Sequence, residues 1–97
     1  MNIFEKVILL DGRCRFWNCG CRNELEVHHI IPKSQGIINE LWNLISLCPI
    51  HHHLITINQV TDIDLLSKLQ CKMDFRWQTA LDWHLQRQAL KNIKKGI

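Results

Sequence analysis

Two stretches of the sequence decide what this chain can fold into: LEVHHIIP at residues 25–32 and NLISLCPIHHHLI at residues 43–55. The first is rich in β-branched and apolar residues and stops at Pro32, which predicts a strand. The second predicts a short strand, or an irregular approach to one, that ends at Cys48. Pro49 then opens a helix, because proline suits the first turn. The pattern predicts strand, loop, strand and helix in close succession.

Two pairs of zinc-ligand residues bracket the first strand. Four residues separate Cys14 from Cys19, and two separate Cys48 from His51. Both spacings let a tight turn present two ligands to one tetrahedral zinc ion, which prefers thiolate and imidazole. We therefore expect these four residues to hold a structural zinc, with Cys21 as an alternative to Cys14 or Cys19. Cysteines can instead be small buried hydrophobes, but that interpretation suits a single cysteine better than two such pairs.

Length and composition fit a small single domain. A chain of 97 residues buries a limited core, which a metal ion often reinforces. Five cysteines, an odd number, do not fit a closed disulfide framework. The N-terminal apolar stretch does not read as a signal peptide, and no run approaches the length of a membrane span. We expect a reducing, cytoplasmic compartment, where thiols stay free to bind metal.

The secondary structure outside residues 13–58 is predicted in less detail. Residues 2–10 fit either a short strand or a helix. Two further helices are expected, over residues 62–70 and from residue 74 to about 93. In the second helix an apolar residue recurs every fourth position, which predicts a stripe that packs on the core or on a partner; its members are Met73, Trp77, Leu81, Leu85 and Ala89.

The two adjacent histidines of the first strand must point to opposite faces, because strand side chains alternate. His28 can therefore bind a metal while His29 faces a reacting water, or the reverse. On the following helix, His52 is turned about 100° from its neighbour His51, so it can return to the ion at the histidine pair. Asn43, whose amide both donates and accepts hydrogen bonds, lies in the connection.

These features together resemble the HNH nucleases, which have a ββα-metal (His-Me finger) fold. The resemblance rests on Cys14 and Cys19 and on the two stretches quoted above. It is specific because the histidine pair, the asparagine, the zinc pair and the final histidine all occupy the positions that the family pattern gives them. It implies an α+β fold with a zinc-stapled core over about residues 13–58 and additional C-terminal helices over about residues 62–95. The chain, residues 1–97, would form a single HNH nuclease domain.

The same resemblance implies a role for each candidate residue. His28 and His52 would bind a catalytic divalent cation (Mg²⁺, Mn²⁺, Ni²⁺ or Zn²⁺), His29 would be the general base, and Asn43 would orient the loop that carries the base. The implied activity is endonuclease hydrolysis of phosphodiester bonds in DNA, by nicking or double-strand cleavage, with low intrinsic sequence specificity. Histidine suits the base because its imidazole can accept a proton from water near neutral pH.

The chain departs from the family pattern at two places. Many members carry Gly-Gly in the loop, where this chain has Gly36-Ile37, and some carry a third histidine ligand where this chain has Thr56. Thr56 can ligate weakly, or water can fill that position, and His53 is an alternative to His52.

Basic residues flank the histidine-rich centre, which is typical of a protein that binds a polyanion. The residues expected to hold nucleic-acid phosphates are Arg13, Arg15, Lys33, Arg87, Lys91, Lys94 and Lys95. Such contacts are salt-dependent and carry no sequence preference, so a homodimer or a partner protein would supply specificity or a second cut. The alternative for the C-terminal bases is a solvated tail.

Two other classes of protein fit part of this sequence. A non-catalytic zinc-finger module that binds nucleic acid explains the cysteines and the bases, but not the other histidines. A metal-storage or metal-sensing protein leaves the C-terminal bases unexplained. The nuclease interpretation accounts for both sets of residues.

Overall fold

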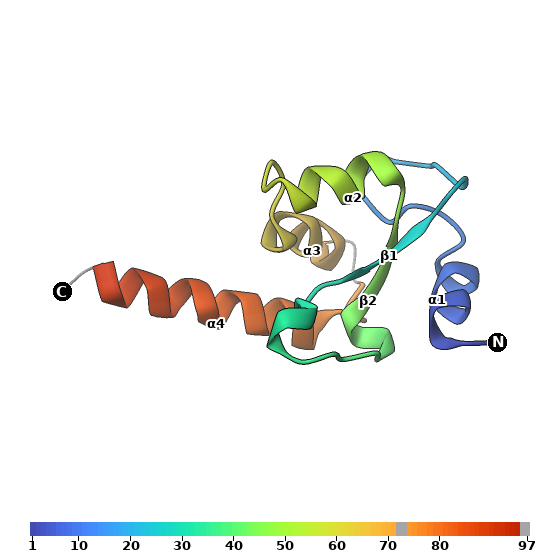
Figure 1. The fold of residues 1–97 in the computed structure, drawn as a ribbon. Helices are drawn as coiled ribbons and strands as arrows, with labels where there is room; N and C mark the ends of the chain where they lie inside the picture. Colours follow the sequence, from blue (N-terminus) through green and yellow to red (C-terminus); the bar gives the residue numbers. More distant parts are fainter. Residues whose placement is uncertain (72–73, 96–97) are drawn as a thin grey trace.

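The computed structural model describes the backbone of residues 1–71 and 74–95, and the side chains of residues 1–69 and 74–93. The elements within these ranges (Figure 1) are α1 (Ile3–Asp11), β1 (Glu26–His29), β2 (Leu44–Leu47), α2 (Pro49–Thr56), α3 (Asp62–Cys71) and α4 (Gln78–Lys95), with short 3₁₀ turns at Lys33–Gln35 and Leu41–Asn43. The α+β prediction is confirmed. None of the described helices is long and apolar enough to span a membrane.

The first segment, which the sequence left undecided, is a helix. Asn2 caps it, since its side chain accepts a hydrogen bond from the Glu5 amide at 2.9 Å. Gly12 ends it in a left-handed conformation, φ +69°, which glycine adopts without steric cost. Helix α1 then packs against β2 on the side away from α2 and α3 (Figure 1).

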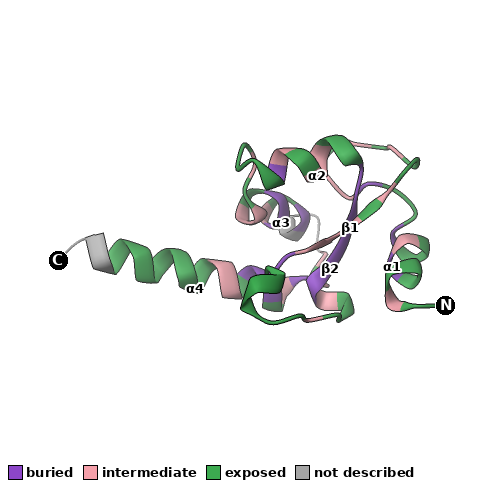
Figure 2. Cartoon of the chain, in the orientation of Figure 1, coloured by how far each residue is buried: buried purple, intermediate pink, exposed green. Residues whose placement is uncertain are grey.

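Strands β1 and β2 form an antiparallel pair in which His28 lies opposite Ile45 and His29 opposite Leu44. Every residue of β2 is buried, because helices cover both of its faces. The one polar member, Ser46, is satisfied by α1: its amide donates to the Asp11 carboxylate at 2.9 Å. This buried strand is the centre around which the helices pack (Figure 2).

The core extends from the strand pair into the C-terminal helices. It joins residues of the cysteine loop, the strands, α2, α3 and the first turns of α4, namely Cys14, Ile30, Ile31, Ile45, Leu47, Cys48, Ile55, Leu65, Leu66, Leu69, Trp77, Ala80 and Leu81. Helices α3 and α4 are therefore part of the same core as the strand pair and α2.

Helix α4 begins later than predicted, at Gln78 rather than at residue 74. The preceding residues are held by side-chain contacts instead: Asp74 pairs with Arg15 at 3.0 Å, and the Arg76 guanidinium binds the Asp11 carboxylate. These contacts hold residues 74–76 against the body of the protein, so the helix starts only after them.

The predicted apolar stripe of α4 is only half buried. Trp77 and Leu81 are each 2% exposed, whereas Leu85 is 41% exposed and Ala89 is exposed too. Met73 lies outside the described residues. The last turns of α4 extend away from the body (Figures 1 and 2), so the stripe ends where the core ends.

The Asp11–Arg76 pair gives the first prediction. The Asp11 side chain is 2% exposed and also accepts from the Ser46 amide, so Asp11→Ala would remove the carboxylate from the partly buried Arg76 guanidinium and leave a buried N–H without its partner. We expect a loss of about 3 kcal/mol in the free energy of unfolding, measured by urea denaturation of the zinc-loaded protein. Lys6→Ala, an exposed change on the same helix, is the control; equal stability of the two variants would contradict the anchoring role.

Candidate active site

The predicted zinc ligands lie together. The ligand atoms of Cys14, Cys19, Cys48 and His51 are all within 4.8 Å of one another, and among the residues that the structure describes no other group of three or more such side chains is this compact. The His51 Nδ1 lies 3.3 Å from the Cys48 sulfur and 3.6 Å from that of Cys14. This group can hold a zinc ion.

The alternative ligand Cys21 is directed elsewhere, since its thiol donates to the Asn23 carbonyl at 3.6 Å. Local structure explains the selection of the other four. Cys48 precedes the first turn of α2 and His51 lies within that turn, while the loop after α1 brings Cys14 and Cys19 to the same helix end. The Phe16 ring stacks on His51 with centroids 4.0 Å apart, which fixes the imidazole.

The electrostatics of this cluster favour a cation. Burial raises the pKa of the Cys14 thiol to about 12, so without a cation this thiol stays protonated at neutral pH. Burial also lowers the pKa of His51, which favours the neutral imidazole that metals bind. A bound zinc ion would supply the charge that stabilises the thiolate, and binding would release protons and strengthen as the pH rises.

His28 and His29 lie on opposite faces of β1. The His28 ring points toward α2 and α3: its Nε2 is 2.7 Å from Asp62 Oδ1, and its centroid is 5.4 Å from that of His52 in an edge-on arrangement. The His29 ring lies on the other face, with its Nε2 2.8 Å from Asn39 Oδ1. The strand alternation thus separates the two imidazoles as the sequence predicts.

The spacing of His28 and His52 suits a shared ion. Two imidazoles bound to one tetrahedral ion have ring centres about 5 Å apart, given metal–nitrogen bonds of about 2 Å, and the observed separation of 5.4 Å is close to this. The Nδ1 of His52 also lies 3.0 Å from Glu26 Oε1. Imidazole is a ligand that divalent transition metals accept.

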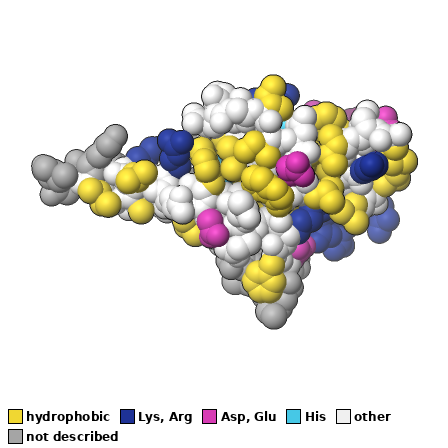
Figure 3. Space-filling view, turned by 90° about the horizontal axis from the view of Figure 1, so that it is seen from below, with side chains coloured by type: hydrophobic (Ala, Val, Ile, Leu, Met, Phe, Trp, Pro, Cys, Tyr) yellow, Lys and Arg dark blue, Asp and Glu magenta, His cyan; other side chains and the backbone are white. Residues whose placement is uncertain are grey.

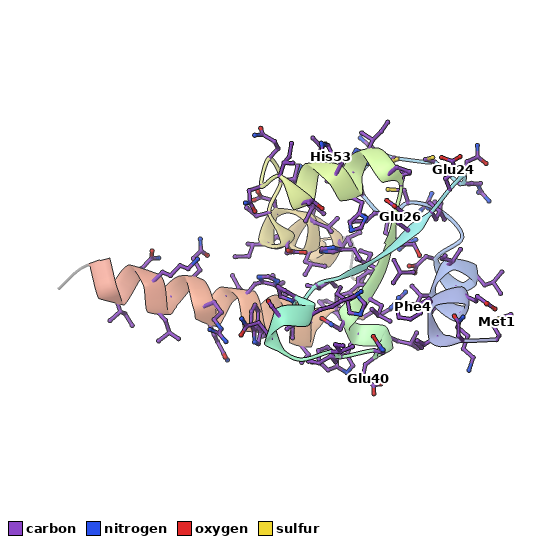
Figure 4. All side chains as sticks on the ribbon, in the orientation of Figure 1. Met1, Phe4, Glu24, Glu26, Glu40 and His53 are labelled. Atoms are coloured by element: carbon purple, nitrogen blue, oxygen red, sulfur yellow. The ribbon has the colours of Figure 1, made fainter. Side chains whose placement is uncertain are left out.

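The two alternative ligands fit the structure less well. His53 is exposed on the outer side of α2 (Figure 4). Thr56 donates its hydroxyl proton to the His52 carbonyl of the same helix at 2.9 Å, so this hydroxyl is engaged within α2.

Asn43 is completely buried and ties the connecting loop together. Its Oδ1 accepts from the Ile31 amide at 2.7 Å, and its Nδ2 donates to the Ile38 carbonyl at 3.0 Å. These bonds fix both ends of the loop, and Asn39, the partner of His29, is the residue after Ile38. Asn43 thereby sets the position of the group that holds His29.

The loop departure at Gly36-Ile37 does not strain the backbone. Gly36 has φ +105°, a value that side chains disfavour, so the retained glycine is the one that the turn requires. Ile37 has no positive φ.

Three neighbours of the histidines were missed by sequence reasoning: Asn39, Asp62 and His84. Asp62 is the first residue of α3, and His84 lies on α4. The fold brings His84 to the end of β1, where its Nε2 donates to the Ile30 carbonyl at 2.6 Å. No local sequence signal marks any of the three, because their partners are distant in sequence or lie across a loop.

The predicted phosphate-binding residues divide into four groups. Arg15 is engaged in the ion pair with Asp74. Arg13 and Lys33 are exposed, with Arg13 lining a recess of about 300 Å³ beside the cysteines. The side chains of Lys94 and Lys95 lie outside the described residues.

Arg87 and Lys91 line a groove of about 430 Å³ between the α2–α3 loop and α4, whose wall also includes Asp62 and His84. The groove therefore reaches the partner of His28. The Arg87 guanidinium lies over the Trp83 ring, 4.6 Å from its centroid, which holds the cation at the surface. Lys and Arg side chains gather at separate places on the face shown in Figure 3.

Residues 14–57 match the family model of the HNH endonuclease. The predicted resemblance is confirmed over this segment. It spans both pairs of the zinc cluster, the strand pair and α2, whereas α1, α3 and α4 lie outside it. No curated protein and no solved structure showed a match to the chain. The match supports a nuclease-family assignment for this segment.

The separation of the zinc cluster from the histidine pair gives the second prediction. Cys48→Ser removes a buried zinc ligand, so zinc should be lost and the domain should unfold or aggregate, because metal binding contributes directly to folding. His52→Ala should keep its zinc and its fold. Zinc content by mass spectrometry and circular dichroism check both variants, and equal zinc loss in the two would mean that they serve one site.

Proposed function

We propose that this chain is a metal-dependent HNH endonuclease that hydrolyses phosphodiester bonds of DNA. The observation that supports this best is that the two adjacent histidines lie on opposite faces of β1. His28 lies beside His52 on one face, and His29 is hydrogen-bonded to Asn39 on the other. One face would bind a cation and the other would supply a base.

His29 is the proposed general base. The side-chain Oδ1 of Asn39 can only accept a hydrogen bond, so the Nε2 of His29 carries the proton and donates it at 2.8 Å. The Nδ1 is then the nitrogen with a free electron pair, and it would take a proton from the attacking water. Asn43 would affect this proton transfer indirectly, because its hydrogen bond to the Ile38 carbonyl holds the loop segment next to Asn39.

His28 and His52 are the proposed ligands of the catalytic divalent cation, and Mg²⁺, Mn²⁺, Ni²⁺ and Zn²⁺ are the candidates. When bound, such an ion would neutralise the charge that develops on the scissile phosphate and the departing oxygen. The two side chains hold their nitrogens at this place because β1 and α2 pack together behind them.

Substrate binding is proposed to rest on phosphate contacts. Arg87 and Lys91 line the groove that reaches Asp62, and Arg13, Lys33, Lys94 and Lys95 would extend the basic surface. Contacts to phosphates carry no base information, so intrinsic sequence specificity would be low. One site cuts one strand, and a double-strand break would need a second copy of the chain or two successive nicks.

His29→Ala gives the third prediction. It should reduce metal-dependent nicking of supercoiled plasmid by 10²–10⁴-fold, the usual contribution of a general base, while zinc content and DNA binding stay at the wild-type level. His53→Ala, on the exposed side of α2, is the matched control and should cut normally. Cleavage by His29→Ala within about tenfold of wild type would exclude this base. A wild type that binds DNA without cutting it would favour the zinc-finger alternative.

Neutralising the groove gives the fourth prediction. The double variant Arg87→Gln, Lys91→Gln should bind all DNA sequences more weakly, and the slope of log Kd against log salt should decrease by roughly two if each cation contacts one phosphate. The exposed pair Lys6→Gln, Lys68→Gln changes the net charge equally outside the groove and serves as control. Salt titrations of fluorescence anisotropy measure both, and identical slopes would remove the groove from the DNA path.

A further inference from the structure

Asp62 holds the proposed metal ligand His28 from the side of α3. Its Oδ1 lies 2.7 Å from the His28 Nε2, and the two side chains are only 15% and 13% exposed. Asp62 is the first residue of α3 and lies beyond residues 14–57, the segment that matches the HNH family. The contact is therefore supplied by a part of the chain outside the motif.

Asp62 is backed in turn by α4. Its Oδ2 lies 3.7 Å from the Nε2 of His84, and that nitrogen donates to the Ile30 carbonyl at 2.6 Å. Ile30 directly follows the histidine pair in sequence. Helices α3 and α4 thus hold the end of β1 at two adjacent points, one on the His28 ring and one on the backbone beside it.

The contact determines which nitrogen of His28 is free. A carboxylate oxygen accepts the Nε2 proton, which leaves the electron pair of Nδ1 for a metal ion. A carboxylate on the non-ligating nitrogen of a metal-binding histidine fixes both its tautomer and its ring orientation. Because both side chains are mostly buried, at 13% and 15% exposed, little water competes for this contact.

The geometry favours this role over direct ligation by Asp62. Among the described residues, His28, His52 and Asp62 do not form a group of three whose ligand atoms all lie within 4.8 Å of one another, whereas the Asp62 Oδ1 lies at hydrogen-bond distance from the His28 Nε2.

We propose that Asp62 is a positioning residue for His28, and that α3, supported by His84 of α4, completes the HNH metal site from outside the motif. This inference rests on the proposed function only in taking His28 as a ligand of the catalytic cation. It predicts that the affinity of this cation depends on a side chain that the family segment does not contain.

The test is the binding of Co²⁺ to the zinc-loaded protein, followed by calorimetry and by the visible absorption of the ion. Asp62→Ala should lower the Co²⁺ affinity 10–100-fold, the usual effect of removing such a partner, with zinc content unchanged. Asp62→Asn keeps an acceptor oxygen and should lose less. Asp64→Asn, an exposed change in the first turn of the same helix, is the matched control and should bind as wild type.

The variants also separate positioning from ligation. At saturation the Co²⁺ spectrum of Asp62→Asn should keep the wild-type shape, because the ligands are unchanged; an altered shape would show that Asp62 is itself a ligand and would overturn the proposal. Wild-type affinity in Asp62→Ala would overturn it too. If the alanine variant does not fold, Asp62→Leu removes the acceptor with less change of shape, and the same two outcomes apply to it.

Failure of this inference is distinguishable from failure of the proposed function. If the wild type binds Co²⁺ beside its zinc but never nicks plasmid, and Asp62→Ala binds Co²⁺ more weakly, the positioning role stands and the nuclease function is refuted. If the wild type nicks plasmid and Asp62→Ala binds Co²⁺ normally, the nuclease function stands and the positioning role is refuted.

Discussion

Antiparallel pairing of β1 with β2 is the constraint on which the candidate site depends, because it places His28 opposite Ile45 and His29 opposite Leu44. With β2 buried on both faces, the pair cannot shift its register by one residue without exposing apolar side chains and exchanging the faces of the two histidines. The burial of β2 therefore protects the arrangement of β1, whose own residues are partly exposed.

Two sets of polar contacts hold the pair at its ends. At one end the cysteine and histidine cluster joins the loop before β1 to the first turn of α2. At the other end Asn43 binds the backbone on both sides of the connecting loop. A small core alone gives limited stability, so a metal ion held by the cluster at one end and the buried Asn43 amide at the other would supply the rigidity that the proposed site needs.

The segments outside the HNH match complete the core. Helix α1 contributes Asp11, which meets the Ser46 amide and the Arg76 side chain, and Trp77, just before α4, donates its indole N–H to the Leu44 carbonyl at 2.8 Å. These contacts converge on β2. Helices α3 and α4 carry Asp62 and His84 to the end of β1, so the packing that stabilises the strands also surrounds the proposed metal ligand.

The local parts of this protein could be predicted from its sequence. The zinc cluster, the strand–loop–strand–helix order and the family follow from short-range features: the spacings of Cys14–Cys19 and Cys48–His51, the proline at the start of α2, and the alternation of His28 and His29. Other features depend on the folded structure: that Cys21 is left out of the cluster, that α4 begins at Gln78, that Arg15 is engaged by Asp74, that Asp62 reaches His28 and that His84 reaches the Ile30 carbonyl. Most of these features join residues that are far apart along the chain. A ligand spacing or a strand alternation is set by backbone geometry over a few residues, whereas the meeting of α3 and α4 with β1 depends on how a shared apolar core closes.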